Sequence, residues 1–268
     1  MRNAQTDAYD KCYVVEMPAQ ARPYIGGNIL LDLLTETEAQ TLLAAAAIVD
    51  FQSGDILLDT NKTIKYVYFP IDMMVSTTTL MRDGFEVEVG SIGCEGMSGA
   101  QVFLGVDHVP GKTICQVSGS AARLPAHTFL EHMERSAASS KSLRRYIQAV
   151  TNFLEISIAC NALHTVSPRC ARWLLITHDR VRRDDFGLTQ EFVANMLGTR
   201  RATVNAVAQN LQDKGAIRYA RGRVQILDRA LLEGASCECY KLGIDRYNEL
   251  LSQAAFTHTN GSPSVSRF

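Results

Sequence analysis

The sequence predicts an α+β protein in which a jelly-roll β-barrel is followed by a long helix and then by a winged helix-turn-helix. Three observations predict this order. Short apolar segments alternate with turn signals over residues 48–124, an uninterrupted helical period covers 140–163, and a helix–glycine–helix pattern covers 189–215. We therefore divide the chain into an N-terminal extension (1–27), a barrel domain (28–136), a long helix (137–164), a winged helix-turn-helix domain (165–233) and a C-terminal tail (234–268).

The composition is that of a folded, water-soluble protein, with 46% hydrophobic and 21% charged residues in a chain of 268. The seven cysteines form no CxxC pair, so we expect a reducing cytoplasm rather than structural disulfides. Residues 1–20 are polar and contain no signal-like apolar core. The best apolar run, 42–49, is far too short for a membrane span, so we expect no contact with a membrane.

The first part of the barrel domain begins with a helical pattern over residues 28–47. Thr35 is the expected N-cap, with Glu38 three residues later to complete a capping box. Glycine-containing turn signals then separate six expected strands, at 55–58, 66–69, 75–80, 86–89, 113–117 and 121–124. Many short strands at this spacing favour a jelly-roll barrel.

The long helix is apolar on two sides. The two stripes are Leu143, Ile147, Val150 and Leu154, and Tyr146, Phe153, Ile156 and Cys160. Such a helix needs two partners. One is the barrel, and we expect the other to be the same helix of a second subunit, with the first stripe in the dimer contact. A central helix buried in a monomer is the alternative. After the long helix, Ser167-Pro168 predicts the start of the next helix.

The segment 189–215 predicts a helix, a glycine turn and a second helix. Thr189 and Thr199 are the expected N-caps, and Gly198 allows the tight turn between the helices. The inward face of the second helix is expected to be Val204, Val207, Ala208 and Leu211, at helical spacing. A basic hairpin follows, with strands at 217–219 and 223–227.

The opposite face of the second helix carries residue types that read DNA bases. Arginine can bond guanine, and asparagine or glutamine can bond adenine. We therefore expect Arg200, Arg201, Asn205 and Gln209 to read bases, and we expect the phosphate contacts to come from Thr189, Thr199, Thr203, Arg218, Arg221 and Arg223. Residues 169–223 hold eleven basic and five acidic side chains, which also favours nucleic acid as the partner.

This order of elements resembles the Crp/Fnr family of bacterial transcription regulators over about residues 28–233. Arg201 and Thr203-Val204 match the family's recognition helix, whereas Ala202 and Ala206 stand where cyclic-AMP-responsive members carry Glu and Arg. The resemblance implies a homodimer whose cyclic-nucleotide-binding-like barrel controls how two recognition helices bind a pseudo-palindromic site in double-stranded DNA. It also implies RNA polymerase as a partner.

Cyclic-nucleotide-binding members of that family hold the phosphate with a Gly-Glu cassette and a following arginine. The corresponding residues here, which form the candidate effector pocket, are Gly93, Glu95, Gly96, Ser98 and Lys112. No arginine lies between Gly96 and Val117, so a buried phosphate would lack its partner. We therefore expect that ordinary cyclic AMP is not the effector, and the sequence leaves the effector unidentified.

The residues predict no metal or other cofactor. Cys12 is the only cysteine before Cys94, which does not fit the N-terminal iron–sulfur cluster of some family members, and isolated His and Cys residues do not predict haem. Cys237 and Cys239 form a pair with no histidine near them in the sequence, so no metal site is expected there.

The sequence also bears on two other classes of protein, an enzyme and a protein-interaction barrel. The six histidines form no His-x-His pair of a cupin metalloenzyme, and no nucleophile elbow, P-loop or dinucleotide motif is found, so we expect no enzyme. The alternative to a DNA-binding regulator is a ligand-binding or protein-interaction barrel whose helix-turn-helix contacts a protein partner.

Overall fold

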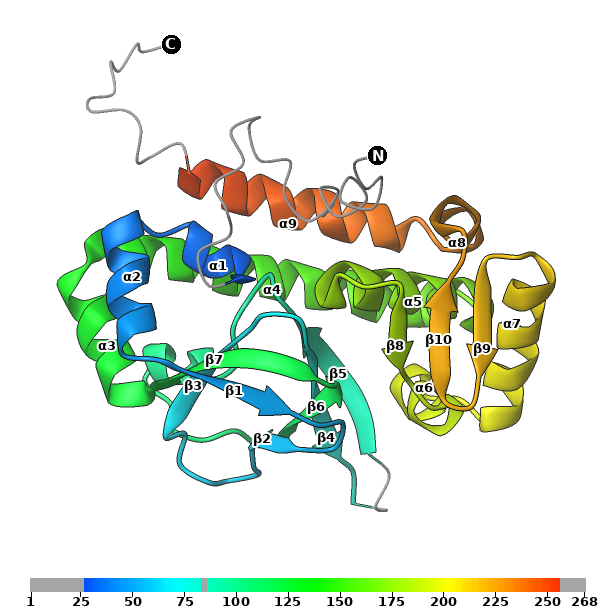
Figure 1. Ribbon diagram of the computed structural model, residues 1–268, viewed down its shortest axis with the longest axis horizontal. Helices are drawn as coiled ribbons and strands as arrows, with labels where there is room; N and C mark the ends of the chain where they lie inside the picture. Colours follow the sequence, from blue (N-terminus) through cyan, green and yellow to red (C-terminus); the bar gives the residue numbers. More distant parts are fainter. Residues whose placement is uncertain (1–26, 83–85, 256–268) are drawn as a thin grey trace, which may run out of the picture.

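The computed structural model describes residues 27–82 and 86–255, which form a barrel, a long helix and a helix-turn-helix domain side by side (Figure 1). The predicted α+β class and the order of these units are confirmed. Among the described residues, no helix is both long and apolar enough to cross a membrane. Residues 1–26 of the N-terminal extension and residues 256–268 of the C-terminal tail lie outside the described residues.

Two short helices precede the barrel, α1 (Ile29–Asp32) and α2 (Glu36–Ala44). The predicted capping box is confirmed, because the Thr35 side chain accepts from the backbone N–H of Glu38 and the Glu38 carboxylate accepts from that of Thr35. Asn28 caps α1 and is fully buried, and its side-chain amide donates to the carbonyls of Pro70 and Gly96 at 2.8 Å each. This amide therefore fixes the entry of the chain onto the barrel.

The barrel consists of two antiparallel sheets, with strand orders β1-β7-β3 and β2-β6-β4-β5. Its elements are β1 (Ala47–Phe51), β2 (Ile56–Leu58), β3 (Tyr66–Pro70), β4 (Met74–Leu80), β5 (Glu86–Ile92), the 3₁₀ helix η2 (Ala100–Leu104), β6 (Lys112–Val117) and β7 (Gly119–Pro125). All six predicted strands are present. The first strand was missed, because β1 follows an alanine-rich helix directly and alternates only weakly between exposed and half-buried residues.

Two helices, α3 (Ala126–Arg135) and α4 (Ala137–Leu163), follow the barrel. Leu143, Tyr146 and Ala149 on α4 are buried in the barrel core, and the Tyr146 hydroxyl donates to the carbonyl of Met97 at 3.0 Å. The long helix thus forms one wall of the barrel domain.

The helix-turn-helix domain follows α4. It comprises α5 (Val166–Val181), β8 (Asp185–Gly187), α6 (Gln190–Leu197), α7 (Arg201–Asp213), β9 (Ile217–Ala220), β10 (Arg223–Ile226) and α8 (Arg229–Ala235). The predicted start of α5 at Ser167-Pro168 is wrong by two residues, because Thr165 is the N-cap and Val166 begins the helix. Pro168 still lies in the first turn, where its missing N–H costs no helical hydrogen bond. Strand β8, which pairs with β10, was not predicted.

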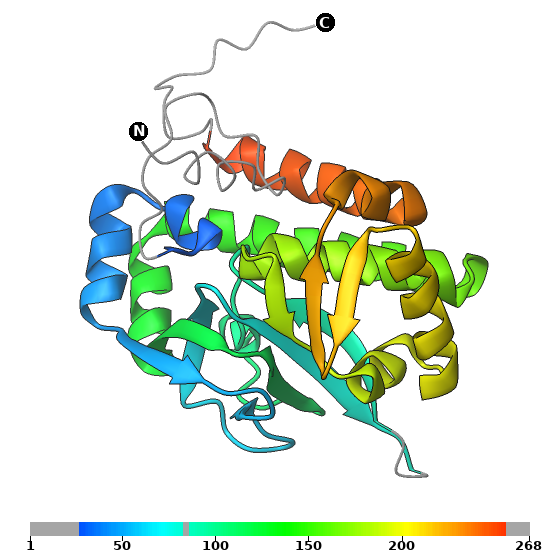
Figure 2. The same cartoon turned by 45° about the vertical axis from the view of Figure 1, so that its right-hand side comes forward.

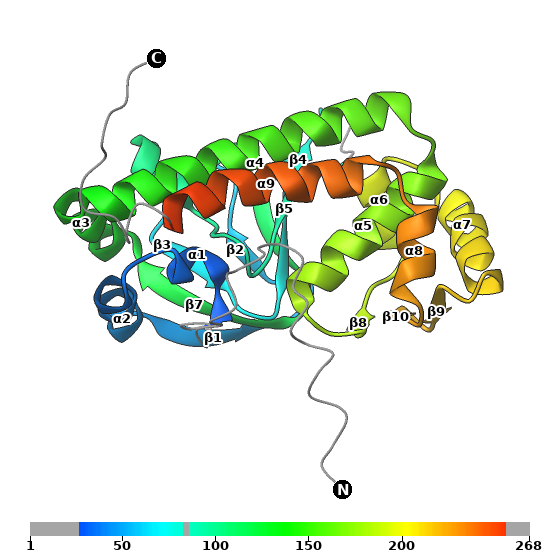
Figure 3. The same ribbon diagram turned by 90° about the horizontal axis from the view of Figure 1, so that it is seen from above.

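The C-terminal tail holds a further helix, α9 (Cys239–Ala255), which the sequence analysis missed. It runs antiparallel to α4 along its length (Figure 3). Gly243 lies against Phe153, where an added Cβ would be 3.1 Å from the ring, and the Tyr247 hydroxyl donates to the carbonyl of Glu95 at 2.9 Å. Helix α9 therefore covers Phe153 of the second apolar stripe of α4, and Tyr146 of the same stripe lies in the barrel core, where the stripe was expected to pack.

The barrel and the helix-turn-helix domain meet at the end of α5 (Figure 2). Arg180 is 6% exposed, its Nε lies 2.8 Å from Glu95 Oε1, and its Nη1 donates to Ser91 Oγ at 2.6 Å. The next two arginines also reach the barrel: Arg182 donates to the carbonyl of Gly27, and Arg183 donates to that of Ser118. The end of one helix thus carries the bonds that join the two domains.

Replacing Glu95 by Ala should lower the free energy of unfolding by about 3–5 kcal/mol, because Arg180 would remain buried without its carboxylate. The double variant Glu95→Leu/Arg180→Met should recover most of this loss. Urea unfolding checks both expectations, with Asp107→Ala, an exposed acid, as the control. Equal losses for Glu95→Ala and the control would contradict the role of the pair.

Glu88 gives this domain contact a pH dependence. Burial raises the pKa of Glu88 to about 7, although hydrogen bonds from Ser76 and from Trp173 of α5 partly oppose the shift. Because the folded protein holds this proton more tightly than the unfolded chain does, its contribution to stability is complete below about pH 4.5 and is lost as the pH rises through 7.

The variant Glu88→Gln removes this titration while keeping a similar shape. Relative to wild type, its free energy of unfolding should rise by about 2–3 kcal/mol between pH 5 and pH 8. Denaturant unfolding across that range measures the difference, with the exposed Glu131→Gln as the control. A difference that stays constant with pH would refute the assignment.

Candidate nucleic-acid interface

Helices α6 and α7 form the predicted helix–turn–helix. Thr189 caps α6 by accepting from the N–H of Phe192 at 3.2 Å, as predicted. Gly198 ends α6 at φ 60°, a left-handed conformation that favours glycine. The prediction that Thr199 caps α7 is wrong: Arg200 occupies the N-cap position, with no side-chain hydrogen bond to the helix. The first turn of α7 therefore keeps backbone N–H groups without a side-chain acceptor.

The buried face of α7 is the one that the helical spacing predicts. Val204, Ala208 and Leu211 are each at most 2% exposed, and Val207 is half-buried against the same core. The second core cluster, to which Val204 and Leu211 belong, also contains Trp173 and Leu174 of α5 and Leu197 of α6. Burial of this face fixes which side of α7 looks outward.

The outward face of α7 carries all four predicted base-reading residues. Arg200, Arg201, Asn205 and Gln209 are exposed, as is Thr203 in the first turn. Gln190 of α6 donates to Asn205 Oδ1 at 3.2 Å, and Gln209 donates to Asp213 at 2.8 Å. These bonds orient the two amides while leaving them at the surface. The two arginines lie where the helix dipole adds positive potential.

The wing is the hairpin of β9 and β10. Its two-residue turn, Arg221-Gly222, has φ of 51° and 72°, as expected for the tight turn that suits a twisted hairpin. Arg221 is exposed at the tip. Arg218 donates to Gln225 at 3.0 Å, and Arg223 forms an ion pair with Asp185 of β8 at 2.5 Å. Arg223 is thus already paired with a carboxylate, which the sequence analysis did not foresee.

The predicted phosphate-contacting residues differ in accessibility. Thr189, Thr203, Arg218, Arg221 and Arg223 are exposed, whereas Thr199 is half-buried in the turn. Five of the eleven bases of residues 169–223 turn inward instead. These are Arg169, which donates to the carbonyl of Leu197, and Arg172, Arg180, Arg182 and Arg183. The exposed positive charge therefore gathers on α7 and the wing.

The candidate effector residues do not surround a ligand-sized cavity. An added Cβ at Gly93 would lie 2.3 Å from Arg180 Cβ, and one at Gly96 would lie 2.3 Å from the Tyr146 hydroxyl. Glu95 is bonded to Arg180, and Ser98 is buried and exchanges backbone hydrogen bonds with Tyr68. The cavity beside Glu95 measures about 30 Å³, far less than the roughly 300 Å³ of a small ligand site. Side chains of α4 and α5 therefore fill the cassette, and Lys112 lies apart from it on β6.

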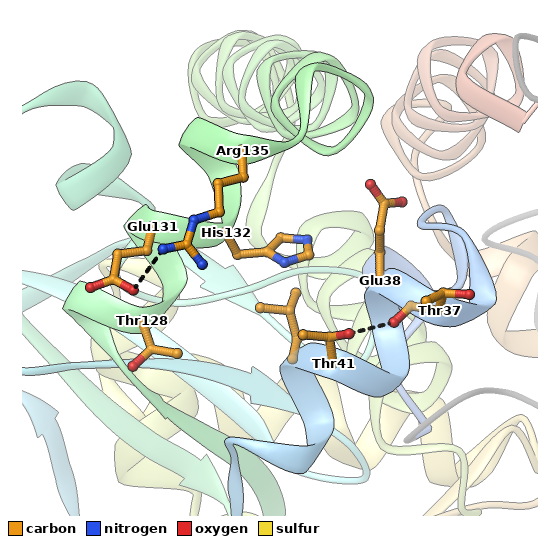
Figure 4. A pocket seen from close by; sticks show the side chains of 8 residues that line it. Thr37, Glu38, Thr41, Thr128, Glu131, His132 and Arg135 are labelled. Carbon is orange, nitrogen blue, oxygen red and sulfur yellow. Dashed lines mark hydrogen bonds and ion pairs between the residues drawn. The ribbon is translucent and has the colours of Figure 1, made fainter.

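A larger pocket, of about 250 Å³, lies between α2 and α3 (Figure 4). Thr37, Glu38 and Thr41 line one side of it, and His132 and Arg135 line the other. Burial raises the pKa of Glu38, but hydrogen bonds from Ser136, Thr35 and Ser139 outweigh it and lower the pKa to about 2. The Glu38 carboxylate is therefore ionised and already hydrogen-bonded to residues at the starts of α2 and α4.

The expected dimer stripe lies against the barrel of its own chain. Leu143 is 3% exposed in the barrel core, Ile147 and Val150 are half-buried against that core, and Leu154 contacts Gly90 of β5. The large apolar side chains that α4 exposes are Ile158 and Leu163, at 69% and 78%. A free apolar surface is thus found nearer the C-terminal end of α4 than the sequence indicated.

Residues 168–235 match the model of the Crp-like helix-turn-helix domain. The chain therefore carries a DNA-binding domain of that type, and together with its barrel it has the fold of Crp/Fnr-type transcription regulators.

Solved structures support the same fold. FixK2 from Bradyrhizobium japonicum aligns with a TM-score of 0.61 at 14% identity, over 72% of this chain and 98% of its own. A CRP-family transcriptional regulator from Thermus thermophilus aligns at 0.59 and 18%, over 71% and 99%. CLP, a c-di-GMP responsive global regulator from Xanthomonas campestris, aligns at 0.55 and 14%, over 71% and 98%. No curated protein matches the sequence.

Proposed function

We propose that this protein is a sequence-specific DNA-binding transcription regulator that acts as a homodimer on a pseudo-palindromic site. The observation that carries the proposal is the exposed face of α7, on which Arg200, Arg201, Asn205 and Gln209 lie together next to the wing. Side chains of these types bond base edges in the major groove, and Arg221 at the wing tip suits a phosphate.

The proposed dimer contact is the C-terminal half of α4. Exposed Ile158 and Leu163 support it, since large apolar side chains on one helix favour a helix partner. A symmetric dimer would present two copies of α7, and its two-fold axis would match the symmetry of a pseudo-palindrome. RNA polymerase is the further protein partner that we propose.

We also propose that the regulator does not respond to ordinary cyclic AMP. The ion pair of Glu95 with Arg180 and the packing of Tyr146 against Gly96 support this, because both occupy the phosphate cassette. The same features supply no reactive pair of side chains, and we propose no enzymatic activity. The alternative role for the helix-turn-helix is a protein contact.

Selection of random duplex DNA by the purified full-length protein, with and without cyclic AMP, tests this function. We expect a two-fold symmetric site bound equally well in both conditions, with affinity that falls steeply with salt. Failure to enrich any sequence, together with an affinity independent of salt, would favour the protein-contact alternative. Binding only with cyclic AMP would refute the proposed independence from it.

Replacing Arg201 by Ala should weaken binding to the selected site by about 1–3 kcal/mol per half-site and relax the preference at one base position. Titration of the selected site and of single-base variants measures both effects. The matched control is Lys214→Ala, which removes an exposed base at the far end of α7. An unchanged base preference in Arg201→Ala would mean that α7 does not read this position.

Replacing Arg221 by Ala should weaken binding to all sequences alike and reduce the salt slope by about one unit per subunit. Arg223→Ala is the matched control from the same hairpin. It should change the slope less, because Asp185 already balances the Arg223 charge. The measurement is the affinity at several salt concentrations, and equal slopes for Arg221→Ala and wild type would contradict a phosphate contact at the wing tip.

A further inference from the structure

Four potential metal ligands converge where α9 begins and α4 ends. They are Cys160, His164, Cys237 and Cys239, and their ligand atoms all lie within 4.8 Å of one another. The Sγ atoms of Cys160 and Cys237 are 3.5 Å apart, as are Cys239 Sγ and His164 Nδ1. No histidine lies near Cys237 and Cys239 in the sequence, but His164 lies beside them in the structure because α9 folds back against the end of α4.

Local geometry explains the convergence. Cys160 and His164 are four residues apart at the end of α4, so they share one face of the helix. Cys237 and Cys239 flank a turn in which the N–H of Tyr240 donates to the carbonyl of Cys237. All three cysteines are at most 7% exposed, and His164 is half-buried. The site is therefore enclosed by protein and reachable on the side of the imidazole.

We infer that Cys160, His164, Cys237 and Cys239 bind one Zn²⁺ in a tetrahedral site. Three thiolates and one imidazole form a common donor set of structural zinc sites. With Zn–S near 2.3 Å and Zn–N near 2.0 Å, the ligand atoms of a tetrahedron lie about 3.5–3.8 Å apart. Two of the distances between ligand atoms already have this length, and the others need to shorten by about 1 Å at most.

The charges around the cluster favour this occupant. Zn²⁺ replaces the protons of three thiols, which pass to solvent, and takes a neutral imidazole as its fourth ligand, so the completed site carries one net negative charge. Arg172 is 8% exposed, and its guanidinium donates to Ser157 Oγ, lies over the Phe153 ring and interacts with the more distant Glu88, but among the described residues it makes no ion pair within 4 Å. Ser157 lies three residues before Cys160 on α4, so this positive charge lies near the cluster. A negatively charged zinc site would place a further negative charge near this buried cation.

The position of the site shows what the metal would hold together. Cys160 and His164 immediately precede α5, and Cys237 and Cys239 immediately follow α8. The two pairs therefore bracket the helix-turn-helix domain at its entry and its exit. With Ile156, the three cysteines form a small cluster separate from both larger cores, so little apolar packing secures this corner. A metal would clamp both ends of the domain to α4 and α9.

Metal content tests the site directly and does not depend on DNA binding. Tag-free full-length protein, prepared under reducing conditions and dialysed against Zn²⁺ and then buffer, should retain about one Zn²⁺ per chain. The control Cys170→Ser, which alters a buried cysteine outside the cluster, should retain the same amount. The variants Cys237→Ser and Cys160→Ser/Cys239→Ser should retain less than about a tenth of it. Equal zinc in all of these proteins would overturn the proposal.

A second measurement uses wild type alone and so does not depend on how the variants fold. Metal-free, reduced protein titrated with Co²⁺ should develop the intense visible absorption of a tetrahedral thiolate site, reach its endpoint near one equivalent, and lose the colour when Zn²⁺ is added. Zn²⁺ should also raise the Tm by several degrees, and a chelator should reverse this. No absorption, or a Cys160–Cys237 disulfide in place of metal under these reducing conditions, would overturn the assignment.

Discussion

The ion pair between Arg180 and Glu95 is the interaction on which the arrangement of the two domains depends. Both side chains are at most 7% exposed, and they come from the last turn of α5 and from the loop after β5. A buried pair of this kind adds little net stability, because both charges lose their hydration. It does make other positions of α5 unfavourable, since moving the helix would leave two unpaired charges in a dry interface.

Neighbouring residues add to this constraint. Asp179 lies 2.7 Å from Arg229 of α8 and accepts a hydrogen bond from the Tyr240 hydroxyl of α9 at 2.7 Å. Two consecutive residues of α5 thus bond to opposite sides, Arg180 to the barrel and Asp179 to the C-terminal helices. Gly93 permits this closeness, because any Cβ there would collide with Arg180. The orientation of α7 therefore follows from α5, which packs against it in the second core cluster.

The sequence predicted those parts of the fold that local patterns determine. Turn signals separated six of the seven barrel strands, Thr35 and Thr189 were recognised as caps, and the spacing of Val204, Ala208 and Leu211 fixed the outward face of α7. The parts that it missed depend on contacts between distant segments. Neither helix α9 nor strand β8 was predicted from its local sequence pattern. Each is stabilised by a segment far away in the chain: β8 pairs with β10, and Tyr247 of α9 donates a hydrogen bond to Glu95.

The excess of arginine in residues 169–223 illustrates this limit. The eleven bases against five acids favoured nucleic acid as the partner, yet Arg180, Arg182 and Arg183 bond the barrel. The sequence cannot separate the two uses, because a guanidinium suits a phosphate and a buried carboxylate or carbonyl equally well. Only burial distinguishes them, as it distinguishes exposed Arg221 from buried Arg180.

With Zn²⁺ bound at the proposed site, helix α5 is held at both ends. Its C-terminal end is fixed to the barrel by Arg180, and its N-terminal end follows directly on His164 and the cysteine cluster. A helix fixed at one end can pivot, whereas one fixed at both ends moves only if a fastening breaks or its anchors move together. Any signal that changes the orientation of α7 must therefore act on the contacts of Arg180 with the barrel or on the cysteine and histidine cluster. One of the bonds to the barrel lies at the cassette residues themselves, where Glu95 would have to exchange Arg180 for a ligand, so binding there would weaken the attachment of α5 and leave the bonds of Arg182 and Arg183 to hold it.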